Sequence, residues 1–175
     1  MEHKKANVKA WQIATIGLGI PAALYFLWDR VNYLAKKQEA FALAKSLTAN
    51  KGILNAGAGP HKAFFAQTIA RSPEIALNID LVPDGMPRFI QLDLEKTPYY
   101  QFQTKQFDVV FASHMLEHLE NWQQCLNELL RIADWVILVL PHPFSLGQLS
   151  PAHKQHFGFK DIERLRKIPN VLLYY

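Results

Sequence analysis

The sequence predicts an α/β fold in which helices flank a mostly parallel sheet and one long apolar helix precedes it. From residue 52 onward, short apolar runs alternate with helical patterns, as they do where helices join parallel strands. A glycine-containing turn follows the first of these runs. Near the N-terminus, Trp11 to Trp28 form an 18-residue run without a charged residue.

The first apolar run ends in the small residues of segment 52–59, Gly-Ile-Leu-Asn-Ala-Gly-Ala-Gly. Gly57 and Gly59 lack a Cβ, so the chain can turn sharply there and a ligand can approach the backbone closely. Pro60 fits the first turn of a following helix, which we expect over residues 62–71. This strand, turn and helix are typical of the start of a nucleotide-type pocket.

Asp80 closes the next apolar run and lies 23 positions after Gly57. A carboxylate about 20 residues beyond such glycines, at the end of the second strand, is placed to accept hydrogen bonds from ribose hydroxyls. The third glycine of the dinucleotide fingerprint is missing, because Pro60 is followed by His61 and Lys62. We therefore expect a pocket for a nucleoside without a pyrophosphate.

Three further segments follow the glycine turn in order: Asn78-Ile79-Asp80, Gln91-Leu92-Asp93-Leu94, and residues 107–119, Phe-Asp-Val-Val-Phe-Ala-Ser-His-Met-Leu-Glu-His-Leu. Together with residues 53–59 they resemble a class I S-adenosylmethionine-dependent methyltransferase, closest to the type 11 group. The resemblance covers residues 52 to about 160. Four motifs in the right order are more specific than any single one.

The resemblance implies a Rossmann-like domain that uses S-adenosyl-L-methionine. It implies that Gly57 and Gly59 line the methionine end of the cofactor, that Asp80 holds the ribose, and that Asp93 with Leu94 frames the adenine. The full set of cofactor-binding residues that we predict is Asn55, Gly57, Gly59, Asp80, Leu81, Asp93, Leu94 and Ser113.

The catalytic residue stays unassigned. His114, His118 and His142 follow the fourth and fifth strands, at the edge where open α/β sheets bind their ligands. Each could act as a general base for a protonated acceptor, and each could equally be structural.

The C-terminal part predicts a fifth strand over Trp135 to Leu140 and one more over Asn170 to Tyr175. Full relatives end in two strands that form an antiparallel hairpin, so we expect a truncated sheet edge or one that a partner completes. An amphipathic helix is expected between the fourth and fifth strands, because apolar residues recur there at spacings of three and four. They are Met115, Leu119, Trp122, Leu126, Leu129 and Ala133.

The apolar run at residues 11–28 predicts one transmembrane helix, since 18 residues span about 27 Å at 1.5 Å each. Trp11 at one end and Tyr25 with Trp28 at the other would lie at the two interfaces. A signal peptide is disfavoured, because no cleavage site of small residues follows. The run could also be a helix that packs against the following domain or a partner.

The predicted organisation is a basic tail over residues 1–10, the transmembrane helix over 11–28, a connecting helix over 29–50 and the methyltransferase-like domain over 51–175. The apolar stripe expected on the connecting helix consists of Val31, Leu34, Phe41, Ala44 and Leu47.

The formal net charge is +4, and much of the excess lies near the N-terminus on both sides of the apolar run. We interpret it as charge that flanks a membrane, not as a nucleic-acid surface. Because both flanks are positive, charge alone does not set the orientation. If the cofactor is used, the domain must face the compartment that contains it, so we expect a single-pass membrane protein with its domain on the cytoplasmic side.

Two motifs receive a structural interpretation. Cys125 is the one cysteine, so it forms no internal disulfide, and its helical pattern predicts a small core residue. His114 to His118 also satisfy the H-x-x-E-H pattern of zinc proteases. That site needs a helix through both histidines, whereas His114 falls where a strand ends, so we predict no metal. His153 and His156 could be recruited to a metal, but their spacing in a loop flanked by Pro and Gly is more typical of an exposed pair or of the rim of a substrate pocket.

The sequence therefore predicts S-adenosylmethionine-dependent methyl transfer to a small or lipid-like acceptor at a membrane surface. The expected partners are membrane lipid along residues 11–28, the acceptor, and a possible membrane protein complex. An alternative is a catalytically inactive accessory subunit of such a complex, with the same fold.

Overall fold

The computed structural model describes residues 10–59, 64–83, 85–145, 148 and 150–175, and within its first helix the side chains of residue 21 and of 23 onward. Its sheet has six strands in the order β3-β2-β1-β4-β5-β6, and every neighbouring pair is parallel. The strands are β1 (Ile53–Ala56), β2 (Ile75–Asp80), β3 (Phe89–Gln91), β4 (Phe107–Ser113), β5 (Ala133–Val139) and β6 (Val171–Tyr174). The predicted α/β class and parallel sheet are confirmed, with β6 pairing directly with β5 at the edge.

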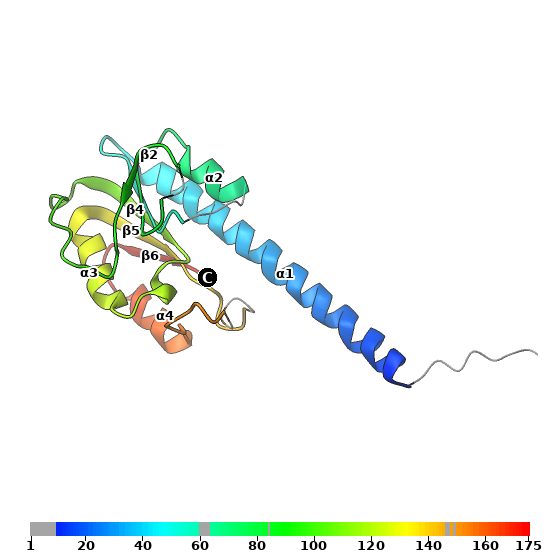
Figure 1. Ribbon diagram of the computed structural model, residues 1–175. Coiled ribbons are helices and arrows are strands. Elements are labelled where there is room, and N and C mark those ends of the chain that lie inside the picture. Colours follow the sequence, from blue (N-terminus) through cyan, green and yellow to red (C-terminus); the bar gives the residue numbers. More distant parts are fainter. Residues whose placement is uncertain (1–9, 60–63, 84, 146–147, 149) are drawn as a thin grey trace, which may run out of the picture.

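Helices cover both faces of this sheet (Figure 1). They are α1 (Ala10–Leu47), α2 (Phe64–Ala70), the 3₁₀-helix η1 (Leu116–His118), α3 (Trp122–Ile132) and α4 (Phe159–Arg166). The end of α1 and α2 pack on one face, where Phe41 and Ile69 meet Phe111. On the other face, α3 and α4 bury Leu129 and Leu165. All seven residues of β4 are buried, because both faces of the central strand are covered.

The first helix differs from the prediction. One continuous helix of 38 residues, about 57 Å long, replaces a membrane segment followed by a separate connecting helix. Its N-terminal part extends away from the sheet (Figure 1). Within the predicted apolar stripe, Val31 and Leu34 are 58% and 41% exposed, whereas Phe41 and Ala44 are buried.

No helix in the described part of the chain combines the length and the apolar character that crossing a membrane requires. The side chains of residues 11–20, more than half of the predicted membrane segment, lie outside the described residues.

One other helix, α3, begins later than predicted, whereas the start of α2 falls at the edge of the described residues. The structure describes α2 from Phe64, and residues 60–63 lie outside the described part. The helix expected from Met115 begins only at Trp122, because the chain adopts two non-helical conformations before it. His114 has φ of 52°, and Leu119 is extended with φ of −100° and ψ of 138°. Residues 114–121 therefore form a loop with one 3₁₀ turn.

Asp108 ties the connection between α1 and β1 to the central strand. Its Oδ2 accepts hydrogen bonds from the backbone N–H groups of Ala49, Lys51 and Gly52 at 2.9, 2.8 and 3.0 Å. Burial alone would raise the pKa of this carboxyl, but the three hydrogen bonds hold the pKa below its usual value. The carboxylate thus satisfies backbone donors of the segment that joins α1 to β1.

Replacing Asp108 with Asn is expected to lower the free energy of unfolding by about 2 kcal/mol at pH 7, because charge-assisted hydrogen bonds are lost. A carboxyl whose folded pKa is lowered stabilises the fold above its unfolded value, and the stabilisation is lost as pH falls through the folded pKa. The difference between wild type and variant should therefore shrink below the usual value of 3.8. Denaturant unfolding over a pH series measures it.

The matched control is Asp134→Asn, which removes an ion pair to Lys51 at 2.7 Å from a carboxylate that is 40% exposed. An exposed pair contributes at most about 1 kcal/mol. Equal losses in the two variants would contradict the role assigned to Asp108.

Candidate functional site

A cavity of about 410 Å³ opens at the carboxyl ends of the strands, on both sides of the point where strand order reverses between β1 and β4. Open α/β sheets bind ligands at this position, and the volume suits a small-molecule ligand. The lining residues are Gly57, Gly59, Asp80, Leu81, Asp93, Leu94, Glu95, His114, Met115, His118, Leu119 and Lys154. We call this cavity the main pocket.

The turn after β1 has the left-handed backbone that glycine favours. Gly57 and Gly59 have φ of 69° and 67°. A Cβ on Gly57 would lie 2.6 Å from Cγ of Met115, closer than real contacts allow. The N–H of Gly57 donates to the carbonyl of Ile79 at 3.0 Å, which holds the turn against β2. The predicted sharp turn is therefore present. Its positive φ and its contact with Met115 both favour glycine at position 57.

Asp80 is fixed at the end of β2 by the backbone. Its Oδ2 accepts the N–H of Gly59 at 2.7 Å, and its Oδ1 accepts the N–H of Val82 at 3.0 Å. A carboxylate offers about four acceptor sites, so two stay available beside the pocket. Asp80 thus has both the position and the acceptor capacity that ribose hydroxyls require.

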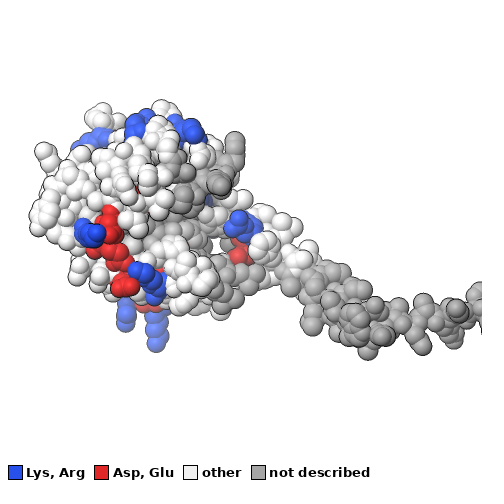
Figure 2. Space-filling model, in the orientation of Figure 1, with Lys and Arg blue, Asp and Glu red and all other residues white. Residues whose placement is uncertain are grey.

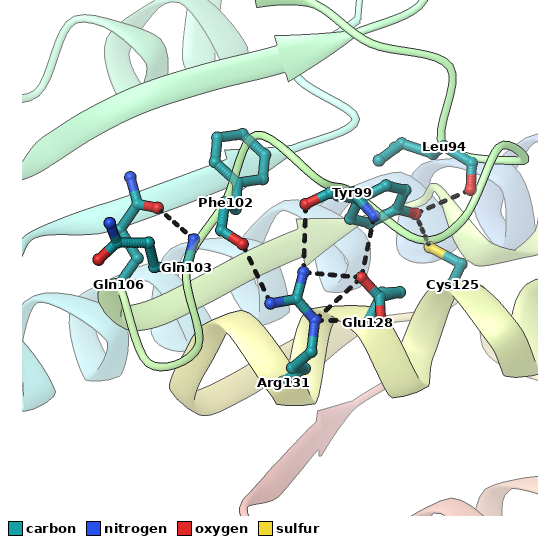
Figure 3. Close-up of polar contacts among 8 residues, drawn as sticks. All are labelled: Leu94, Tyr99, Phe102, Gln103, Gln106, Cys125, Glu128 and Arg131. Carbon is teal, nitrogen blue, oxygen red and sulfur yellow. Dashed lines mark hydrogen bonds and ion pairs between the residues drawn. The ribbon is translucent and has the colours of Figure 1, made fainter.

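Asp93 and Leu94 reach the main pocket because the chain after them is bound to α3 (Figure 3). The Arg131 guanidinium donates to the backbone carbonyls of Tyr99 and Phe102 at 3.1 and 3.0 Å. The Tyr99 hydroxyl donates to the carbonyl of Leu94 at 2.8 Å. This network positions the segment predicted to frame an adenine.

Glu128 completes the network, since its carboxylate pairs with Arg131 at 2.9 Å and accepts the N–H of Tyr99 at 3.0 Å. Sequence reasoning missed this network, although Glu128 and Arg131 have the i,i+3 spacing of a helical ion pair. Cys125 lies beside the Tyr99 hydroxyl and is fully buried. Burial raises the pKa of its thiol to about 12, which confirms a core residue and not a reactive one.

Six of the eight predicted cofactor residues line the main pocket, and Asn55 and Ser113 do not. Both line a smaller cavity between the sheet and α1, together with Lys37. Asn55 donates from Nδ2 to Oδ1 of Asn78 at 2.8 Å, so its amide links β1 to β2. Roles for Asn55 and Ser113 at the cofactor stay predictions.

The three candidate histidines separate into two groups. His114 and His118 line the main pocket, whereas His142 stacks on Tyr175 with ring centroids 5.7 Å apart. The Nδ1 of His114 lies 3.1 Å from Oε1 of Glu117, and its ring meets the ring of Tyr33 edge-on at 4.6 Å. Since Tyr33 belongs to α1, the first helix reaches the wall of the pocket.

Charged side chains close one rim of the pocket. Lys154 pairs with Glu95 at 3.3 Å and with Glu120 at 3.1 Å. Glu95 also accepts the backbone N–H groups of Glu120 and Asn121. Figure 2 shows acidic and basic side chains interleaved on the side of the domain that carries α3. These contacts hold the loop around residue 154 next to the segment that contains Asp93.

The parallel sheet, the glycine turn and the terminal acid of β2 define a Rossmann-like domain with a pocket at the carboxyl ends of its strands. Residues 54–134 match the family model described as a methyltransferase domain. Together with the fold, this match supports a class I methyltransferase domain in that segment, and the members of the matching family use S-adenosylmethionine.

A solved structure with a similar fold is the YcgJ protein from Bacillus subtilis, with 14% sequence identity and a TM-score of 0.50. The alignment covers 73% of this chain and 65% of that chain, and at this identity it shows the fold alone. A search of curated proteins found no match.

Gly57→Ala is expected to destabilise the protein by at least about 1–2 kcal/mol, from left-handed strain together with the contact to Met115. Thermal unfolding measures the change. Gly85→Ala is the control, because Gly85 also has positive φ, 61°, but a Cβ there meets nothing within 4 Å. Equal losses would show that strain alone, and not the packing against Met115, constrains the turn.

Proposed function

We propose that this protein transfers a methyl group from S-adenosylmethionine to a small or lipid-like acceptor at a membrane surface. The observation that carries the proposal is the main pocket, in which the glycine turn, Asp80 and the Asp93–Leu94 segment face one cavity within a methyltransferase domain. These residues come from the ends of three strands, and their convergence supplies the contacts that a nucleoside ligand needs.

Each part of the cofactor can be assigned to particular residues of the main pocket. Gly57 and Gly59 leave the backbone accessible for the methionine end, Asp80 has free acceptor sites for the ribose, and Leu94 supplies an apolar wall for the adenine. The cofactor supplies an electrophilic methyl group on a sulfonium. The protein contributes position, which accounts for much of the rate in such a displacement. His114 or His118 could accept a proton from a hydroxyl acceptor.

Calorimetric titration of the detergent-solubilised full chain with S-adenosylmethionine tests the pocket. We expect saturable binding by wild type and a loss of at least about tenfold in affinity for Asp80→Ala, because the ribose loses a charged acceptor. Glu163→Gln is the control, since that carboxylate is exposed on α4 and pairs with Lys167.

Failure of the folded wild type to bind would contradict the enzyme proposal. It would favour the alternative of an inactive accessory subunit with a methyltransferase fold. Equal weakening by Asp80→Ala and Glu163→Gln would contradict the assigned pocket alone.

The exposed surface of α1 supports the membrane part of the proposal. Leu24, Phe26, Leu27, Trp28 and Val31 are each between 53% and 62% exposed on a helix that leaves the domain (Figure 1). Contiguous apolar surface of this kind marks a membrane or protein interaction site. Because Tyr33 of the same helix touches His114, a bilayer around residues 11–28 would lie near the pocket and favour a lipid-like acceptor.

Co-sedimentation of the full chain with vesicles of phosphatidylcholine and phosphatidylglycerol tests this interaction. Replacing Leu27 and Trp28 with Glu is expected to reduce the bound fraction, because charges on this face oppose contact with the acyl chains. Tyr100→Glu is the control, since Tyr100 is 89% exposed on another surface. Binding that neither variant changes, or no binding by wild type, would contradict the membrane role.

A further inference from the structure

Glu117 is a fully buried carboxylate without a hydrogen bond. It is 0% exposed, and neither Oε1 nor Oε2 has a hydrogen-bond partner in the described part of the chain. The Nδ1 of His114 lies 3.1 Å from Oε1, without making such a bond. Burying an ionised carboxylate is costly unless a cation or hydrogen-bond donors compensate it. The environment of Glu117 therefore points to a missing partner.

Two histidines, His118 and His153, place nitrogen atoms near the carboxylate of Glu117. One potential ligand atom from each of Glu117, His118 and His153 lies within 4.8 Å of the others. The rings of His118 and His153 meet edge-on, with centroids 4.8 Å apart. Among the described residues, the buried Nδ1 of His153 has no hydrogen-bond partner. The cluster thus combines a carboxylate with two imidazoles, one of which has an unused buried nitrogen.

The Nδ1 atom of His118 makes the kind of hydrogen bond that the non-coordinating nitrogen makes in metal-binding histidines. This atom lies 3.0 Å from the backbone carbonyl of Ala152. A carbonyl is an acceptor only, so Nδ1 carries the proton and the lone pair stays on Nε2. Hydrogen bonds of this kind set the tautomer and the ring orientation of histidine ligands.

The backbone holds the two halves of the cluster together. The N–H groups of Lys154 and Gln155 both donate to the carbonyl of Glu117, at 2.8 and 3.0 Å. The loop that carries His153 is thereby fixed against η1, which carries the other two residues.

We propose that Glu117, His118 and His153 bind a zinc ion. Two imidazoles and one carboxylate are a ligand set that zinc accepts, and three protein ligands leave a fourth position for water or a substrate atom. Zinc–ligand bonds near 2.1 Å place tetrahedral ligand atoms about 3.4 Å apart, so the side chains close by about 1.4 Å at most. The ion lies beside the main pocket, because His118 lines both.

This site differs from the zinc-protease pattern of His114 and His118. No helix runs through those two residues, since His114 follows β4 with positive φ and η1 begins at Leu116. His153, which lies 35 positions after His118 in the sequence, takes the place of the first pattern histidine, His114. The cluster arises only because the loop folds back onto η1.

The competing explanation is an internal ion network. Lys37 is buried near Glu117, and burial lowers the pKa of its amine to about 8 while Glu117 acts in the opposite direction. A protonated Lys37 would then neutralise the carboxylate, and the histidines would only pack against each other. The two explanations differ in whether the protein binds zinc with one-to-one stoichiometry.

The test uses the full chain after chelator treatment, without S-adenosylmethionine, so its outcome does not depend on methyl transfer. Cobalt(II) is titrated first, because its visible absorption reports tetrahedral coordination by protein ligands, and zinc then displaces it. We expect one ion per chain. His153→Ala should weaken zinc binding at least about 100-fold, more than loss of an outer hydrogen bond does. His156→Ala is the control, since His156 is an exposed residue of the same loop.

Glu117→Gln gives a second, nearly isosteric variant, and circular dichroism checks that each variant is folded. Zinc should raise the melting temperature of wild type and of His156→Ala but not of Glu117→Gln or His153→Ala. Absence of saturable one-to-one binding by wild type would overturn the proposal. Equal losses in the His153 and His156 variants would overturn it as well, because they would indicate adventitious binding.

Discussion

The close packing of Met115 against Gly57 is the constraint on which the site depends. The turn after β1 and the loop after β4 meet there with no room for a Cβ, which fixes the distance between two walls of the main pocket. On one side, the turn presents its backbone and binds Asp80 through Gly59. On the other side, the loop that begins at His114 carries the histidines to the same opening. A Cβ at position 57 would push the turn after β1 and the loop after β4 apart.

Much of the domain could be predicted from the sequence because its signals are local. Gly57, Gly59 and Asp80 lie at strand ends that short apolar runs predict, and a parallel sheet brings such ends to one edge. The helix predicted after β4 is present as α3, but its predicted start at Met115 was wrong, because the apolar spacing continues through a segment that turns at His114 and extends at Leu119. Periodicity reports which side chains are buried, and here burial in a loop resembles burial on a helix.

Features that depend on distant contacts could not be predicted in the same way. The hydrogen bonds of Arg131 to the carbonyls of Tyr99 and Phe102 join segments about 30 residues apart. Placement of Asn55 away from the main pocket follows from its bond to Asn78, a partner on the neighbouring strand. Likewise, His153 joins Glu117 only through a returning loop. No spacing rule relates these residues, because the fold and not the chain makes them neighbours.

The position of α1 and the chemistry at the pocket are coupled through Glu117. This helix lies outside the segment that matches the methyltransferase family, yet it places Tyr33 against His114 and buries Lys37 near Glu117. Burial raises the pKa of Tyr33 most, and after the opposing effect of Arg30 the charge of Glu117 raises it further. A cation bound at Glu117 would therefore alter the interactions that hold α1 against the domain. The helix α1 is thus connected to the site, because Lys37 on this helix and His114 in the pocket wall both lie near Glu117.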